Sequence, residues 1–158
     1  REISSFKQAV MMLGLNKLFR WAAMLLTTAR DGGPPSAVGQ TAVIRGRLME
    51  LLAKQSPCSP DADLAFICGM FSMLDRMLGI PLDAALALIP VPDALCDALL
   101  HQQGILGELL MLAMACENQE YQPSSSPYNA GASELHLSPQ DINSAHLQAM
   151  RWTANLFD

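Results

Sequence analysis

The sequence predicts an all-α protein, a compact bundle of about seven or eight helices joined by short loops. Three observations support this fold class. Apolar residues recur every three or four positions along most of the chain, which is the spacing of one helix face. Capping residues stand where several of these patterns begin, and glycine or proline stands where they end. No segment alternates polar and apolar residues for long enough to predict a strand.

Two helices are expected before a glycine- and proline-rich loop at residues 30–36. Ser5 and Gln8 have the spacing of a capping box, and Gly14 ends or bends the helix that they open. The apolar face of this first helix consists of Phe6, Ala9, Val10 and Leu13. A second apolar face follows over residues 15–29 and consists of Leu15, Leu18, Phe19, Ala22, Leu25, Leu26 and Ala29.

The middle of the chain predicts two longer helices. The first covers residues 37–54 and ends at a second proline-containing loop, residues 55–60. Asp61 or Asp63 then caps a helix that continues to a stop at Gly79.

Prolines divide the next part of the chain. Pro81 opens a short helix that ends before Pro90, and Pro92 opens another that stops near Gly104. Residues 105–116 are strongly apolar and predict a buried helix.

The C-terminal part combines a linker with one long helix. Residues 122–133 are rich in proline, serine, glycine and asparagine, which predicts a loop or linker. Ser138 and Pro139 have the order of an N-cap and a first helical residue, so a last helix is expected from there to about Phe157.

Length and composition limit the class of protein. A chain of 158 residues is one domain by size, and 51% hydrophobic with 16% charged residues excludes a disordered chain. The net charge of −5 argues against a nucleic-acid partner, which positive charge would attract. No apolar run of about 18 residues is present, so no membrane span is expected.

The cysteines favour a reducing compartment. Cys58, Cys68, Cys96 and Cys116 are widely spaced, without a C-x-x-C pair, and three of them lie in apolar runs. This pattern predicts unpaired thiols and a cytoplasmic location, with a zinc site or a disulfide as the alternative.

Candidate catalytic residues are few. His101, His136 and His146 are scattered, and none is adjacent to an aspartate, whereas a metal phosphohydrolase needs several convergent ligands. We therefore interpret them as surface or capping histidines. Asp75 and Asp83 could form an acid–base pair, but helix-surface or capping roles suit them better.

Arg45 and Arg47 are the one close basic pair in the middle of the chain. An R-x-R pattern can bind phosphate, yet residues two apart on a helix point to different faces. The alternatives are solvated arginines or a buried ion pair with an acid such as Glu50 or Asp75. Ser72 lacks the glycines and the strand of a nucleophile elbow.

Ten methionines are present, and most fall on predicted helical faces. The main groups are Met11-Met12, Met70-Met73-Met77 and Met111-Met114-Met150. Two interpretations are open: flexible side chains that fill the core, or an adaptable interaction surface.

Four segments then carry a family resemblance, in this order: ISSFKQAV at residues 3–10, LFRW at 18–21, AVIRGRLMELLA at 42–53 and AFICGMFSMLD at 65–75. Shorter matches follow at residues 81–82, 98–104 and 149–152. This ordered series resembles an HDOD domain. Its most specific match, residues 65–75, is similar to the variety found behind an EAL domain in bacterial cyclic di-GMP signalling proteins.

The resemblance implies one HDOD-like domain over residues 3–158, of the helical HD superfamily. It also implies that the family's first helices and any upstream EAL domain are absent from this sequence. HDOD domains lack the catalytic His-Asp pair of HD phosphohydrolases. The expected function is thus a non-catalytic output or regulatory module that binds a protein or a neighbouring domain, most directly an EAL domain. No catalytic, cofactor-binding or metal-ligating residue is assigned.

Two other functions stay open: a divergent metal-dependent HD-type phosphohydrolase, and a structural dimerisation domain. If helices of the family are absent, the first helices here should expose apolar residues that two copies can cover by pairing. We therefore expect a homodimer that uses an N-terminal surface. That surface consists of Phe6, Val10, Leu13 and Trp21.

Overall fold

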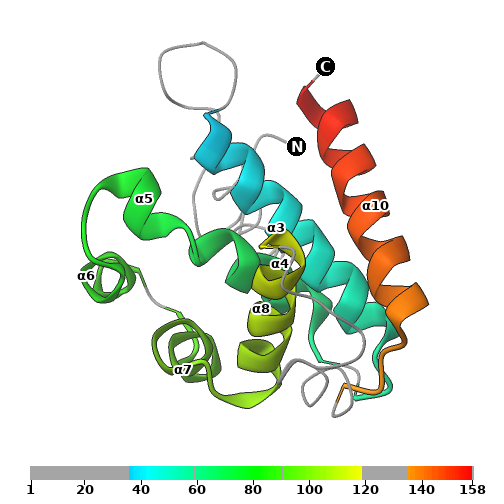
Figure 1. Cartoon of the computed structure of the whole chain (residues 1–158). Coiled ribbons are helices and arrows are strands. Elements are labelled where there is room, and N and C mark those ends of the chain that lie inside the picture. Colours follow the sequence, from blue (N-terminus) through cyan, green and yellow to red (C-terminus); the bar gives the residue numbers. More distant parts are fainter. Residues whose placement is uncertain (1–35, 59, 90, 119–134, 158) are drawn as a thin grey trace, which may run out of the picture.

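The computed structural model describes residues 36–58, 60–89, 91–118 and 135–157 (Figure 1). All regular structure in these ranges is helical, which confirms the all-α fold class. The helices are α3 (Ala37–Gln55), α4 (Ala62–Phe71), α5 (Leu74–Leu78), α6 (Leu82–Ala87), α7 (Asp93–His101), α8 (Gly104–Glu117) and α10 (Pro139–Phe157). The helices expected at residues 5–29, the linker at 122–133 and the N-terminal dimer surface lie outside the described residues.

Helix α3 is the centre of the fold and contacts α4, α8 and α10 (Figure 1). The Ser36 side chain caps it by accepting a hydrogen bond from the amide of Gly39, at 3.1 Å. Apolar side chains on several sides of the helix are buried because neighbours cover it on several sides. They include Ala42, Val43, Leu48, Met49, Leu52 and Ala53.

Two glycines allow α3 and α4 to cross at close range. A Cβ atom on Gly69 would lie 2.6 Å from the Cα of Gly46, and one on Gly46 would lie 2.8 Å from the carbonyl oxygen of Phe66. Any larger residue would push one backbone against another. The crossing therefore fixes the depth at which the apolar face of α4 enters the core.

The helix predicted from Asp61 to Gly79 is interrupted. Asp61 caps α4 by accepting from the amides of Asp63 and Leu64, and Gly79 ends α5 with a left-handed φ of 73°. Between these ends, the chain leaves the helix at Ser72 and Met73. The hydroxyl of Ser72 donates to the carbonyl of Gly69 at 2.7 Å, which competes with the helical pattern there. The sequence interpretation as one helix was wrong at this point.

Helices α7 and α8 meet at a tight elbow. Gln102, with a φ of 55°, ends α7, and Gly104, with a φ of 72°, opens α8. The predicted stop near Gly104 is therefore the start of the next helix, and the stop itself is two residues earlier. A Cβ atom on Gly107 would lie 2.3 Å from the carbonyl carbon of Gln102, so the elbow closes directly over this glycine.

Helix α10 begins at the predicted N-cap. The amide of Asp141 donates to the Ser138 hydroxyl at 3.2 Å, and the amide and hydroxyl of Ser138 donate back to the Asp141 carboxylate. These hydrogen bonds lower the pKa of Asp141 below its usual value. The helix lies beside α3 and runs in the opposite direction (Figure 1). Near its start, the hydroxyl of Ser56 donates to the carbonyl of Leu135 at 2.8 Å and ties the two segments together.

Among the described helices, none alone has both the length and the apolar composition of a membrane span. Helices α7 and α8 together satisfy those two criteria, but across a bend of 40°.

Candidate functional site: a groove beside a buried arginine network

Arg45 is the centre of a buried polar network. It comes from the middle of α3, is only 7% exposed, and forms a bidentate pair with Glu117 at the end of α8. Its Nε donates to Oε1 at 2.8 Å and its Nη2 to Oε2 at 2.5 Å. Its Nη1 donates to the hydroxyl of Ser72 at 2.7 Å. The network thus joins α3, the break between α4 and α5, and the C-terminus of α8.

The sequence predicted a buried ion pair as one option for Arg45, but the suggested partners were wrong. Glu50 instead accepts from Arg47 and from Lys54, each at 2.7 Å, within α3 itself. Asp75 lies half-buried on α5. Glu117 is 72 positions from Arg45 in the chain, and nothing local in the sequence indicates that pair.

Phosphate binding by the R-x-R pattern has no support from this geometry. All three guanidinium nitrogens of Arg45 donate to protein acceptors, and its charge is matched by Glu117. Arg47 points elsewhere, as the spacing predicted. Its guanidinium lies 5.2 Å from the ring centroid of Trp152 on α10, a cation–π contact.

A groove of about 440 Å³ lies beside this network, between α3, the end of α8 and α10. Its lining consists of Thr41, Ile44, Cys116, Glu117, His146 and Met150. Glu117 belongs both to the groove and to the ion pair, so the groove wall is connected directly to the buried network. On α10, Leu147 is 57% exposed and Met150 is 49% exposed. The groove therefore has a polar wall at Glu117 and an apolar edge on α10.

The groove offers no activated nucleophile. Burial, followed by the neighbouring charge of Glu117, raises the pKa of the Cys116 thiol to about 11. Burial likewise raises the pKa of Cys68 to about 12, partly offset by the positive charge of Arg45. Both thiols are protonated at neutral pH, and a protonated thiol is a poor nucleophile. No disulfide joins the four cysteines.

The three histidines lie on separate elements. His101 is the last residue of α7 and is exposed; His136 is exposed in the segment before α10; His146 is half-buried on α10 and lines the groove. In the part of the chain that the structure describes, no group of three or more His, Cys, Asp or Glu side chains is arranged to hold a metal ion. The candidate acids Asp75 and Asp83 lie on different helices, α5 and α6.

The methionines divide between the two interpretations. Met49, Met70 and Met73 are buried and fill the core, whereas Met150 lies half-exposed on the groove. The pair Met11-Met12 lies outside the described residues.

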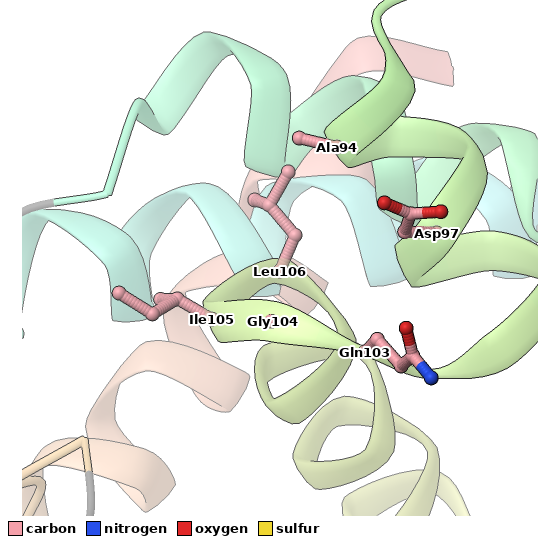
Figure 2. Close-up of a pocket in the computed structure, with 6 residues that line it drawn as sticks. All are labelled: Ala94, Asp97, Gln103, Gly104, Ile105 and Leu106. Carbon is pink, nitrogen blue, oxygen red and sulfur yellow. The ribbon is translucent and has the colours of Figure 1, made fainter.

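A second cavity of about 400 Å³ lies at the elbow between α7 and α8 (Figure 2). Asp97 of α7 and Gln103 of the elbow form its polar end, and Ala94, Ile105 and Leu106 are its apolar residues. Asp97, Gln103 and Ile105 are exposed. This cavity contains no buried polar side chain directed at a ligand, so the groove on α10 is the stronger candidate.

Comparison with known proteins finds two distant curated relatives. The chain is 29% identical over 161 residues to the uncharacterized protein YuxH of Bacillus subtilis. This alignment covers 100% of the chain and 38% of YuxH. The chain is also 27% identical over 154 residues to the cyclic di-GMP phosphodiesterase CdgJ of Vibrio cholerae. That alignment covers 98% of the chain and 35% of CdgJ. No family model and no solved structure matches the chain. The chain thus spans little more than a third of the length of the curated relatives it matches.

Proposed function

We propose that this chain is a non-catalytic regulatory module of a bacterial cyclic di-GMP signalling protein. The observation that carries the signalling part of this proposal is the similarity, over 98% of the chain, to a protein named as a cyclic di-GMP phosphodiesterase. That similarity involves only 35% of the relative. The part of the relative outside the alignment is long enough for a separate catalytic domain. The resemblance of residues 65–75 to HDOD domains found behind EAL domains agrees with this division.

A non-catalytic role is supported by the use of the polar side chains. Arg45, the most buried cation among the described residues, is held by Glu117 and Ser72 rather than presented to a substrate. The candidate histidines are dispersed over three elements. The groove has an apolar edge at the exposed Met150, which suits contact with a protein or a neighbouring domain.

An in-frame deletion of the codons for residues 36–157 in the source bacterium tests this role. The expected result is a changed cellular level of cyclic di-GMP while the rest of the gene product, followed by immunoblot, persists at its normal amount. An unchanged nucleotide level with a persistent product would contradict a regulatory role.

A further inference from the structure

Helices α6, α7 and α8 carry acidic residues but neither lysine nor arginine. The sequence contains no Lys or Arg between Arg76 and Arg151, and all three helices lie inside that interval. Exposed carboxylates stand on the first two of these helices, at Asp83 on α6 and at Asp93 and Asp97 on α7. A surface with charge of one sign attracts partners of the opposite sign. This part of the molecule therefore suits a basic partner.

The cavity at the elbow between α7 and α8 lies on this acidic surface. Asp97 and Gln103 stand at one side of it and Ile105 at the other (Figure 2). The Asp97 side chain is exposed and forms no hydrogen bond or ion pair with another described residue. Ile105 is 41% exposed, and so is Leu100, one turn after Asp97 on α7. The cavity thus combines an unpaired carboxylate with exposed apolar side chains, which is typical of a contact surface for another protein.

Backbone contacts hold the walls of this cavity in place. The amide of Gln103 donates to the carbonyl of Asp97 at 3.2 Å, and the amide of Gln102 donates to the carbonyl of Ala98 at 3.1 Å. Gly107 of α8 packs directly against Gln102 from the other side. These contacts join the end of α7 to the start of α8, so the two walls are positioned before any partner arrives. A preformed site loses less conformational entropy on binding.

We propose that this cavity receives an arginine side chain of a partner protein, with apolar residues on either side of that arginine. The guanidinium pairs with the carboxylate of Asp97, and the side-chain oxygen of Gln103 accepts a further hydrogen bond. The methylene stem packs on Ala94 and Leu106, and the flanking apolar side chains cover Ile105. The proposal rests on the proposed function, because it names the surface through which the regulatory module contacts a protein.

Titration of the isotope-labelled full chain with the acetylated tripeptide amide Leu-Arg-Leu, followed by NMR, tests this site. The tripeptide should shift the backbone amide signals of residues 94–106. In Asp97→Asn its affinity should fall about fivefold, which is the upper end of what one exposed ion pair contributes. Asn has nearly the size of Asp and the position is exposed, so the amide signals of α3 and α4 should keep their native positions.

Asp83→Asn is the matched control, since Asp83 is an exposed carboxylate on α6 that does not line the cavity. This variant should bind the tripeptide as tightly as the native chain does. Equal affinities of Asp97→Asn and Asp83→Asn would overturn the proposal, as would unshifted signals for residues 94–106 in the native chain.

Two further tripeptides separate the contributions of charge and apolar contact. Leu-citrulline-Leu has the same shape without the charge and should bind the native chain about fivefold more weakly. Gly-Arg-Gly keeps the charge without the apolar flanks and should also bind more weakly than Leu-Arg-Leu. If Gly-Arg-Gly bound as tightly as Leu-Arg-Leu, charge attraction alone would explain the binding and the proposed site would be wrong.

This titration and the deletion experiment have separate readouts. A failed titration overturns the arginine site alone, because the cellular level of cyclic di-GMP in the deletion strain measures the regulatory role without reference to this cavity.

Discussion

Arg45 shows how much one side chain can connect. Its guanidinium joins α3 to the end of α8 and to the break after α4, and it forms an ion pair with Glu117. The sequence could predict a buried pair but not its partner, because the pairing depends on the packing of helices that are distant in the chain. A buried pair of this kind is costly to break on one side only, since an uncompensated charge then stays in the interior.

Substitution of Glu117 alone should therefore strongly destabilise the fold. Glu117→Leu should lower the free energy of unfolding by about 3–5 kcal/mol, whereas the double variant Arg45→Met with Glu117→Leu should lose much less. Urea denaturation of Arg45→Met, of Glu117→Leu and of the double variant gives the coupling energy between the two side chains. Strictly additive losses would show that the two side chains do not stabilise each other.

Cys68 provides a pH signature of the core. Burial raises the pKa of the Cys68 thiol from its ordinary value of 9.0 to about 12, so the folded state favours the protonated form. The contribution of the protonated Cys68 thiol to the free energy of unfolding is present in full below pH 9 and is lost as the pH rises toward 12. The slope is about 1.4 kcal/mol per pH unit for one thiol.

Chemical denaturation of the native chain and of Cys68→Ala at pH 8, 9 and 10 gives the free energy of unfolding of each at each pH. The difference between their pH dependences is the contribution of Cys68. Cys58→Ala, at an exposed thiol, is the control and should keep the native slope. An identical pH dependence in native protein and Cys68→Ala would refute the assignment.

At the scale of elements, local signals predicted the helix N-caps well, the ends of α4 and α7 less well, and tertiary contacts poorly. The helix expected at 37–54 is α3, and the caps at Asp61 and Ser138 are in place. The break at Ser72 was missed because its hydroxyl is positioned by Arg45 from another helix. The α3–α4 crossing was missed for a related reason. A glycine inside a helix can be recognised as a close-contact position only when the helix packed against it is known.

Gly69→Ala tests that crossing. On an open helix this change stabilises by about 1 kcal/mol, but here the new Cβ meets the backbone of α3 and should cost about 3 kcal/mol. Gly79→Ala is the control: its Cβ would meet nothing within 4 Å, so only the left-handed backbone costs energy, about 1 kcal/mol. Thermal unfolding compares them, and equal losses would mean that the crossing is not tight.

At the scale of the whole molecule, periodicity sufficed for the fold class, while the groove could not be foreseen. Its lining residues come from three helices that are distant in the chain, so no short segment contains them all. They are Thr41 and Ile44 on α3, Cys116 and Glu117 on α8, and His146 and Met150 on α10. The sequence analysis interpreted His146 as a surface or capping histidine, whereas the structure places it half-buried in the lining of the groove, together with Met150. Sequence similarity, rather than a motif, relates the chain to a protein named as a cyclic di-GMP phosphodiesterase.

The nucleotide itself should bind weakly to this chain. A dinucleotide with two phosphates requires arginines and backbone donors gathered in one place. Here Arg45 is occupied by Glu117, and Arg47 lies on Trp152 and pairs with Glu50. Calorimetric titration with cyclic di-GMP should therefore show no tight binding, and micromolar or better affinity would contradict this expectation.

The most direct test of the non-catalytic role is product analysis of cyclic di-GMP incubated with the purified full chain and added Mg²⁺ or Mn²⁺. We expect no hydrolysis above the protein-free control, because the described residues contain no group of three or more His, Cys, Asp or Glu side chains arranged to hold a metal ion. Metal-dependent turnover that disappears in His146→Ala, while that variant keeps its native unfolding midpoint, would contradict the account and establish a phosphohydrolase instead.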